Sequence, residues 1–315
     1  MTRAFIFPGQ GSQTVGMGQD LAENFAEARE VFEEIDESLS QKLSAMMFSG
    51  EADDLNLTEN TQPALMAVSM AVVRVLEKQG GINLAEKATF VAGHSLGEYS
   101  ALTAAGALGV SECAKLLKLR GQAMQRAVPV GQGAMAAILG LDFDVVAALA
   151  AEASTEAESV EAANDNSVGQ VVVSGHKEAV ERAIALASEK GAKRALLLPV
   201  SAPFHSKLMA PAAAEMRDAL ADANIAAPNP AVVSNVLAAS TNDAQAIRGL
   251  LVDQITGMVR WRESVIWMKV QGVSEMVELG AGKVLCGLVR RIDKEITTGN
   301  AGNVAEIEAL IEALS

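Results

Sequence analysis

Apolar and polar positions along the chain fall into blocks that predict strands and helices. Short apolar runs such as Ala4 to Phe7 and Thr89 to Ala92 are typical of buried parallel strands. Longer segments repeat their apolar positions at helical spacing, and they span 21–35, 63–76, 96–106 and 111–126. Strands separated by long helical stretches predict an α/β fold built on a parallel sheet.

The pattern changes between residues 129 and 198. The predicted order there is strand, helix, strand, strand, helix, strand, over 134–139, 142–153, 160–163, 170–175, 177–189 and 195–198. This is the order of a ferredoxin-like unit. We therefore predict a small ferredoxin-like domain, 129–198, inserted into a large α/β-hydrolase-like domain made of 1–128 and 199–315. Further predicted elements of the large domain are helices at 208–223, 244–256, 261–271, 283–291 and 306–314, and strands at 231–235 and 274–279.

Composition narrows the classes of protein that this chain can belong to. The net charge of −14 over 315 residues argues against nucleic acid as a partner. No apolar run is long enough to span a membrane. The apolar stretch at the start of the chain is also shorter than the apolar region of a signal peptide. Cys113 and Cys286 read as reduced, buried thiols, and three histidines without paired cysteines suggest no metal site. We expect a cytoplasmic, monomeric protein without a cofactor.

One motif carries a specific chemistry. Residues 93–97 read Gly-His-Ser-Leu-Gly and lie between a predicted strand and a predicted helix. This is the Gly-x-Ser-x-Gly pattern of a nucleophile elbow, in which a sharp turn holds the serine out of the backbone near the positive end of a helix. The alternative is a plain glycine-rich turn. The flanking strand and helix favour Ser95 as a nucleophile.

An activated serine needs a base, and the chain has three histidines. His94 is adjacent to the serine and should pack beneath the turn, while His176 should begin a surface helix. His205 follows the point where the chain re-enters the large domain, so it has the best position. No acid that would orient its imidazole stands out, since Asp243 and Asp253 are unremarkable. A backbone carbonyl can do the same work.

Two further features stay open on the residues alone. The loop Pro8 to Gln13 fits neither a dinucleotide nor a phosphate motif, and it is either an ordinary turn or a source of N–H groups beside the elbow. In the second case, one such N–H and that of Leu96 would form an oxyanion hole. Arg120 lies on the apolar face of a predicted helix. It either grips a carboxylate through two parallel hydrogen bonds or extends to solvent.

Taken together, the motifs resemble one family. They occur in this order: Phe7-Pro8-Gly9-Gln10-Gly11-Ser12-Gln13, Gly93-His94-Ser95-Leu96-Gly97-Glu98-Tyr99, Arg120, Ala202-Pro203-Phe204-His205-Ser206 and Asp253-Gln254. Over essentially its whole length the chain resembles the bacterial malonyl-CoA:acyl carrier protein transacylases. The combination is specific to that family, although no single motif is.

The resemblance implies an activity and a role for each residue. In such an enzyme the serine takes malonyl from malonyl-CoA as an ester and passes it to the phosphopantetheine thiol of acyl carrier protein, in fatty-acid biosynthesis. The implied assignments are Ser95 as nucleophile, His205 as acid–base, Gln10 and Leu96 as oxyanion donors, Arg120 for the malonyl carboxylate and the Gln254 carbonyl for orienting the histidine. Asn166 is placed in the cleft, with Asn164 as a competitor, and the bulk of Phe204 favours malonyl over methylmalonyl.

Other interpretations remain at this stage. A serine thioesterase or another hydrolase shares the elbow, a polyketide-pathway acyltransferase shares the whole chemistry, and a scaffold could keep the fold without activity. Carrier proteins are acidic, which conflicts with the negative charge of this chain. We therefore predict a local basic patch at the cleft mouth, made of Lys193, Arg194, Arg290 and Arg291.

Overall fold

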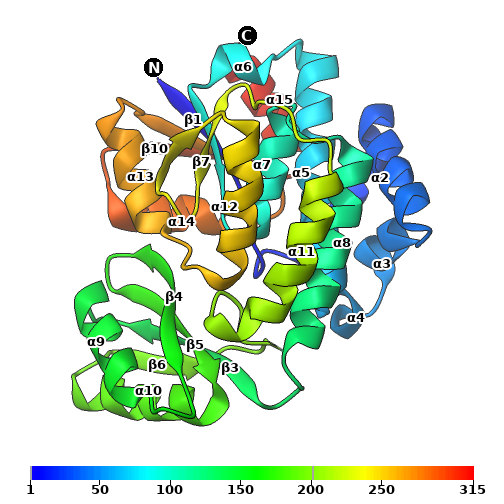
Figure 1. The fold of residues 1–315 in the computed structure, drawn as a ribbon. Helices are drawn as coiled ribbons and strands as arrows, with labels where there is room; N and C mark the ends of the chain where they lie inside the picture. Colours follow the sequence, from blue (N-terminus) through cyan, green and yellow to red (C-terminus); the bar gives the residue numbers. More distant parts are fainter. Residues whose placement is uncertain (1, 201) are drawn as a thin grey trace.

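The larger of two sheets forms the centre of the fold in a computed structural model that describes residues 2–200 and 202–315 (Figure 1). Its strand order is β10-β9-β1-β2-β7-β8. All neighbouring strands are parallel except β7 and β8. The strands are β1 (Arg3–Phe7), β2 (Phe90–Gly93), β7 (Ala231–Ser234), β8 (Ala239–Thr241), β9 (Glu275–Leu279) and β10 (Thr297–Ala301). The predicted α/β class with a parallel sheet is confirmed.

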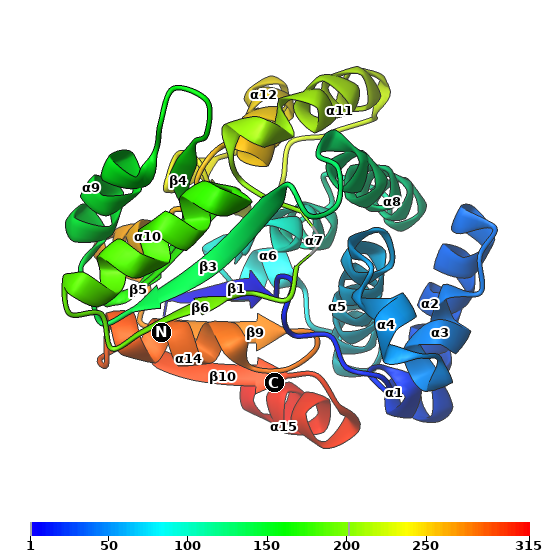
Figure 2. The same cartoon turned by 90° about the horizontal axis from the view of Figure 1, so that it is seen from below.

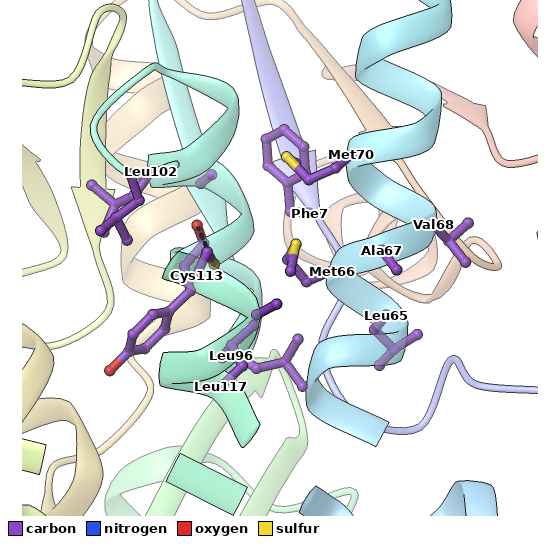
Figure 3. Close-up of a cluster of buried hydrophobic side chains, with 14 of the residues drawn as sticks. Phe7, Leu65, Met66, Ala67, Val68, Met70, Leu96, Leu102, Cys113 and Leu117 are labelled. Carbon is purple, nitrogen blue, oxygen red and sulfur yellow. Dashed lines mark hydrogen bonds between the residues drawn. The ribbon is translucent and has the colours of Figure 1, made fainter. Parts of the chain in front are cut away.

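Helices cover both faces of this sheet because its central strands are apolar on both sides. Phe5 and Phe7 of β1 belong to the core on one face, and Ala4 and Ile6 to the core on the other. Figure 3 shows the first core, where Met66 of the long helix α5 lies close to Phe7. Helices of the large unit are α1 (Gln19–Asn24), α2 (Ala26–Leu39), α3 (Leu43–Ser49), α4 (Ala52–Asn56), α5 (Thr58–Gly80), α6 (Leu84–Lys87), α7 (Leu96–Ala104), α8 (Val110–Ala127), α11 (Ala210–Asp222), α12 (Ala244–Thr256), α13 (Trp261–Val270), α14 (Val284–Ile292) and α15 (Val304–Leu314), with a 3₁₀ turn η1 (Lys207–Met209).

A second, antiparallel sheet lies beside the first (Figure 2). Its order is β4-β5-β3-β6, and the chain runs β-α-β-β-α-β through it, as predicted. Its elements are β3 (Gly133–Leu139), α9 (Phe143–Ala153), β4 (Val160–Ser167), β5 (Gln170–His176), α10 (Lys177–Glu189) and β6 (Arg194–Leu197). One face packs against its two helices. On the other face, Met135 and Val172 join the main core, so this sheet forms a wall against the large unit.

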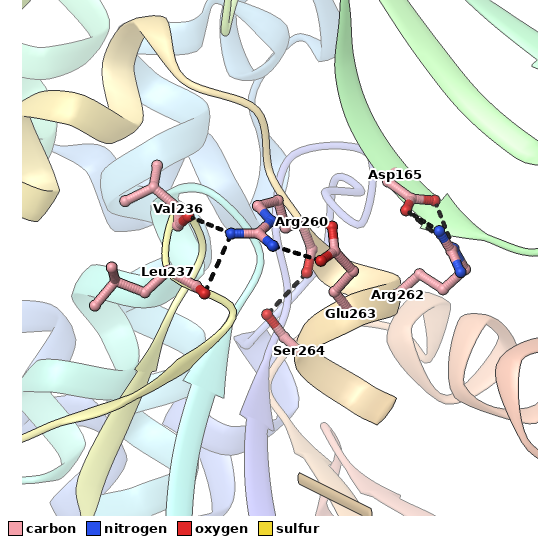
Figure 4. Close-up of polar contacts among 7 residues, drawn as sticks. All are labelled: Asp165, Val236, Leu237, Arg260, Arg262, Glu263 and Ser264. Carbon is pink, nitrogen blue, oxygen red and sulfur yellow. Dashed lines mark hydrogen bonds and ion pairs between the residues drawn. The ribbon is translucent and has the colours of Figure 1, made fainter. Parts of the chain in front are cut away.

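The two units are joined through β4. The Asp165 N–H donates to the Val259 carbonyl at 3.0 Å, and the Val259 N–H donates to the Ala163 carbonyl at 2.9 Å. The buried Asp165 carboxylate also accepts from the Arg262 Nε of α13, at 3.0 and 2.9 Å to its two oxygens, and its Oδ2 lies 2.8 Å from the Arg262 Nη2 (Figure 4). Because a charge-assisted fork fixes orientation, β4 has a defined position relative to the large sheet.

Several boundaries differ from the prediction. The helix expected over 21–35 is wrong, since the extended residue Phe25 ends α1 and begins α2. The helix expected from Pro63 begins at Thr58 and contains the proline. β4 continues past the predicted end to Ser167. Strands β8 and β10 were not predicted, because they are short and poor in apolar residues.

Three findings bear on the class of protein. Cys113 and Cys286 are both buried free thiols. Within the described ranges, no group of three or more histidine, cysteine, aspartate or glutamate side chains is arranged to hold a metal ion. Across the same ranges, no helix combines the length and apolarity needed to cross a bilayer.

Candidate active site

The turn between β2 and α7 places Ser95 at the edge of the large sheet. Ser95 has φ 53° and ψ −112°, a conformation that non-glycine residues rarely adopt and that costs on the order of 1–3 kcal/mol. A Cβ added to Gly93 would lie 1.9 Å from the Gly97 carbonyl carbon, and one added to Gly97 would lie 2.3 Å from the Phe7 carbonyl oxygen, so the turn packs this closely only because both residues are glycines. The predicted elbow geometry is therefore present, and strained backbone of this kind collects at functional sites.

Asn235, at the carboxyl end of the neighbouring strand β7, holds the elbow in place. Its Oδ1 accepts from the Ser95 N–H at 2.7 Å, and its Nδ2 donates to the Gly93 carbonyl at 2.7 Å. The side chain is fully buried. Asn235 was not predicted as a site residue. The sequence held one signal that could have identified it, because Asn235 is the last residue of a predicted strand of the large sheet.

His205 reaches the serine from the loop that follows the small sheet. Its Nε2 lies 2.8 Å from Ser95 Oγ, while its Nδ1 lies 2.8 Å from the Gln254 carbonyl and 3.2 Å from that of Gly257. Since both carbonyls only accept, Nδ1 carries the proton and Nε2 is free to accept the serine proton. In a catalytic triad, a carboxylate accepts the Nδ1 proton of the histidine, and here two backbone carbonyls take that position. Asp243, one of the two acids considered, caps the N-terminus of α12.

The environment of His205 keeps its imidazole neutral. Burial, and after it the Arg120 guanidinium, lowers the pKa of His205 to about 3. A base must be unprotonated to accept the serine proton, and this pKa leaves it unprotonated at neutral and mildly acidic pH.

We therefore expect kcat/KM for acylation of Ser95 to stay flat from about pH 8 down to about pH 5, because His205 does not titrate in this range. Burial raises the pKa of Glu98 to about 7, but both N–H bonds it accepts end on Oε2, which still accepts when Oε1 holds the proton. The pH–rate profile of acylation checks this. An acidic limb with a midpoint at about 6.5, the ordinary value for histidine, would contradict it.

Arg120 of α8 is fully buried and points at the nucleophile. Its Nη1 donates to Gln62 Oε1 at 2.7 Å, and its Nη2 donates to Gln254 Oε1 at 2.9 Å and to Ser95 Oγ at 3.2 Å. Its Nε has no partner within the described part of the chain, and no carboxylate there forms an ion pair with it. A buried cation whose hydrogen bonds all go to neutral groups is costly, so the site is suited to an anionic ligand. The alternative of extension to solvent is wrong.

Two residues in the lining of the same cavity, Leu96 and Gln10, have backbone N–H groups without an acceptor among the described residues. Leu96 is the first residue of α7, so its N–H is one of the unpaired donors at the positive end of a helix. Neither its N–H nor that of Gln10 has an acceptor among residues 2–200 and 202–315, and both residues line the cavity at Ser95. The arrangement is suited to binding an oxyanion formed next to the serine.

A cavity of about 160 Å³ is lined by all the predicted site residues except Gln254, which is bonded to His205 and Arg120. His94 Nε2 and Asn166 Oδ1 are 2.7 Å apart, so the small unit contacts the elbow directly. Asn164 and Phe204 also line the cavity, which leaves both asparagines in reach of a ligand. His176 lies elsewhere, before α10, where its Nδ1 accepts from a backbone N–H. His94 packs against Trp261 as well as lining the cavity.

Three more residues form a polar layer around the cavity that sequence reasoning missed. Gln62 and Thr58 on α5 line the cavity, and Gln62 binds Arg120. Glu98 is buried and accepts from the Gln254 Nε2 at 2.7 Å, while the Oε1 of the same glutamine accepts from Arg120. The Gln254 side chain therefore links the buried Glu98 carboxyl to the buried Arg120 guanidinium, in addition to the predicted role of its carbonyl.

The chain as a whole is similar to a known protein family and to solved structures. The acyl transferase domain family matches residues 4–249. The chain is 47% identical over 309 residues to the malonyl CoA-acyl carrier protein transacylase of Escherichia coli (strain K12), covering 98% of each. The acyl-carrier-protein-S-malonyltransferase from Bartonella henselae is 54% identical with a TM-score of 0.97, covering 100% of this chain and 99% of that one.

A further solved structure contains a carrier protein. In the complex of a type II PKS acyl-carrier protein with its malonyl-transacylase, the matching chain has a TM-score of 0.95 at 42% identity, and the match covers 99% of this chain and 100% of that one. Both similarities to solved structures extend over both sheets. They therefore include all of the elements that line the cavity.

Proposed function

This chain belongs to the acyl transferase domain family, and from that premise we propose that it transfers malonyl from malonyl-CoA to the phosphopantetheine thiol of acyl carrier protein. Fatty-acid biosynthesis is the proposed setting. A polyketide pathway with the same chemistry is the second candidate, favoured by the similarity to a type II PKS transacylase bound to its carrier protein. The shared chemistry, not the pathway, follows from the site.

The residues around Ser95 support a two-step transfer. His205 Nε2 accepts the proton of Ser95 Oγ as this oxygen attacks the thioester carbonyl, and the N–H groups of Gln10 and Leu96 stabilise the oxyanion. The carbon–sulfur bond then breaks, the coenzyme A sulfur takes the proton from His205, and malonyl remains as an ester on the serine. In the second step, the carrier thiol attacks this ester, and the same groups act in reverse order.

The observation that carries the proposal is the buried guanidinium of Arg120, which no carboxylate of the described residues pairs. Malonyl-CoA ends in a carboxylate that this fork can bind through two parallel hydrogen bonds, whereas acetyl-CoA has none. A hydrolase acting on neutral acyl groups gains nothing from such a cation. The bulk of the buried Phe204 beside the cavity is consistent with malonyl over its methylated analogue.

Replacing Arg120 by alanine should therefore lower malonyl transfer by about 10- to 150-fold, the equivalent of roughly 1.5–3 kcal/mol for a charge-assisted bidentate pair. Transfer of acetyl from acetyl-CoA should fall much less, so the preference for malonyl is lost. Competition kinetics with both substrates measure this. Arg126→Ala on the same helix, which removes an exposed ion pair with Glu215, is the matched control. Equal losses on both substrates would rule out the carboxylate clamp.

Product analysis separates transfer from hydrolysis. The wild-type protein, given malonyl-CoA and carrier protein, should yield malonyl carrier protein and free coenzyme A. Release of malonate at a similar rate would instead favour the thioesterase interpretation.

We also propose the finer description of the fold. The large unit, 1–128 with 199–315, would be α/β-hydrolase-like, since a parallel sheet carries the elbow at a strand-to-helix turn. The inserted unit, 129–198, would be ferredoxin-like, which its β-α-β-β-α-β order supports.

The carrier protein is acidic, and we propose that it docks on the exposed side chains of Lys193, Arg194, Arg290 and Arg291. Lys193 and Arg291 line one hollow of about 650 Å³ beside the turn between β4 and β5. None of the four forms an ion pair with another described residue, so their charge is available to a partner.

Reversing two of these charges, Lys193→Glu with Arg291→Glu, should raise the Michaelis constant for carrier protein by about tenfold, because each lost rim contact costs roughly 0.2–1 kcal/mol and each new repulsion adds to this. The constant for malonyl-CoA should stay the same. Steady-state kinetics with each substrate varied in turn check this, and Arg29→Glu with Lys78→Glu is a control with the same change in charge. An unchanged constant for carrier protein would exclude this docking surface.

A further inference from the structure

A chain of side-chain hydrogen bonds runs from Arg120 to the loop that carries the Gln10 N–H. Arg120 Nη1 donates to Gln62 Oε1 at 2.7 Å, Gln62 Nε2 donates to Thr58 Oγ1 at 2.9 Å, and Thr58 Oγ1 donates to Gln10 Oε1 at 3.1 Å. Thr58 and Gln62 are one helical turn apart on α5, so both point the same way. The chain thus spans the cavity from the carboxylate site to the oxyanion donor.

Chemistry fixes the direction of the first two bonds in this chain. A guanidinium only donates, so Gln62 must turn its oxygen to Arg120 and its nitrogen to Thr58. The Thr58 hydroxyl, which receives that N–H, keeps its own proton and donates it to Gln10 Oε1. Thr58 and Gln62 are each no more than 1% exposed, so water does not compete for the two buried bonds that join Arg120, Gln62 and Thr58.

The exposed tip of the loop, Gln10 and Gly11, lies between the buried residues Gly9 and Ser12 and forms few hydrogen bonds of its own. Gln10 and Gly11 are both exposed, and Gly11 has φ 107°, in the region of backbone conformation that favours glycine. The Gly11 N–H donates to Gln13 Oε1 at 2.7 Å, and Gln13 Nε2 donates to Asn56 Oδ1 at 3.0 Å, in an exposed contact. The part-buried bond from Thr58 is therefore the one that ties the Gln10 side chain to helix α5. An oxyanion donor contributes only when it is held at the right place.

We propose that Thr58 is a positioning residue that holds the Gln10 loop so that the Gln10 N–H points at the same place as that of Leu96. The proposal rests on acyl transfer at Ser95. Thr58 touches no reacting atom and acts through the Gln10 side chain. Its loss weakens stabilisation of the oxyanion, which every acyl group forms, and leaves the carboxylate clamp intact, because Arg120 keeps its bonds to Gln62 and Gln254.

The test is the rate of acylation of the full-length protein in a single turnover, with malonyl-CoA and with acetyl-CoA. Thr58→Val has almost the same shape but no hydroxyl, and it should lower both rates by the same factor of about ten. The concentration of malonyl-CoA that gives half the maximal rate should stay the same. Thr58→Ser keeps the hydroxyl and should restore most of the rate.

Two further variants keep the test independent of folding. Gln10→Met removes the acceptor from an exposed side chain but keeps the backbone N–H, so it should reproduce the tenfold loss, and combining it with Thr58→Val should add nothing. Thr61→Val is the matched control, because this buried threonine of the same helical turn bonds only to the Leu55 and Leu57 carbonyls. Its acylation rates should match those of the wild type.

The outcomes separate this inference from the proposed function. If the wild type is acylated but Thr58→Val is unaffected, or loses activity with malonyl-CoA alone, the positioning role is wrong and the proposed function stands. Full additivity of the Gln10 and Thr58 changes would also overturn it. If malonyl-CoA does not acylate even the wild type, the proposed function fails and this inference fails with it.

Discussion

Replacing Ser95 by alanine is expected to lower malonyl transfer by about 10⁴-fold or more, because no covalent intermediate can then form. The Ser95 oxygen is held by the strained backbone of the elbow, by the hydrogen bond between the Ser95 N–H and Asn235, and by its own bond to His205. Steady-state transfer assays measure the loss. Binding of malonyl-CoA should persist, since Arg120 keeps Gln62 and Gln254 as partners.

The matched control is Ser100→Ala, on the same helix α7. Ser100 is fully buried, and its hydroxyl has no hydrogen-bond partner within the described residues, so its loss should leave transfer close to that of the wild type. A Ser95→Ala protein that still transfers malonyl at more than a small fraction of the wild-type rate would rule out serine as the carrier of the acyl group.

Replacing His205 by alanine is expected to lower the acylation rate by about 10³-fold or more, within the range that general acid–base catalysis contributes. Ser95 would keep its bond from Arg120 at 3.2 Å, so its position would change little while its proton would have no acceptor. Stopped-flow measurement of coenzyme A release gives the rate. The affinity for malonyl-CoA should be nearly unchanged.

His176→Ala provides the control for this variant. His176 precedes α10 on the small unit and is bonded to the backbone of Ser159, away from the cavity. Its loss should not change the acylation rate. If His205→Ala acylates as fast as His176→Ala, another group must accept the serine proton and the assignment of the base is wrong.

The elbow and the histidine could be predicted because each depends on local pattern. Gly93 and Gly97 are required wherever a strand and a helix meet so closely, so the turn is visible in the sequence itself. His205 could be predicted from its place in a loop after a strand, where the chain returns to the large sheet, because such loops collect site residues. Their 2.8 Å contact, across 110 residues of sequence, is a product of the whole fold.

The α5 side chains were missed because the start of their helix was placed wrongly. Proline favours the first turn of a helix, so the pattern placed the start at Pro63. The helix actually begins at Thr58, which puts Thr58 and Gln62 one turn apart on the cavity side. That error hid both the partner of Arg120 and the attachment of the Gln10 loop.

The edge of the large sheet was missed for a different reason. β10 reads Thr-Thr-Gly-Asn-Ala, and it has no apolar run because it is paired on one side only. Hydrophobic pattern detects strands buried on both faces and fails at such edges. The partners of Arg120 and Gln254 are likewise invisible to local pattern, because they join α5, α7, α8 and α12.

The central claim is that Ser95 carries malonate between two thiols, and intact-protein mass spectrometry tests it most directly. Wild-type protein mixed with malonyl-CoA should gain the mass of one malonyl group, on the peptide that contains Ser95. Adding carrier protein with its phosphopantetheine arm should then return the enzyme to its starting mass and move the malonyl group to the carrier. A mass that never changes, or a malonyl group that leaves only as free malonate, would contradict the account.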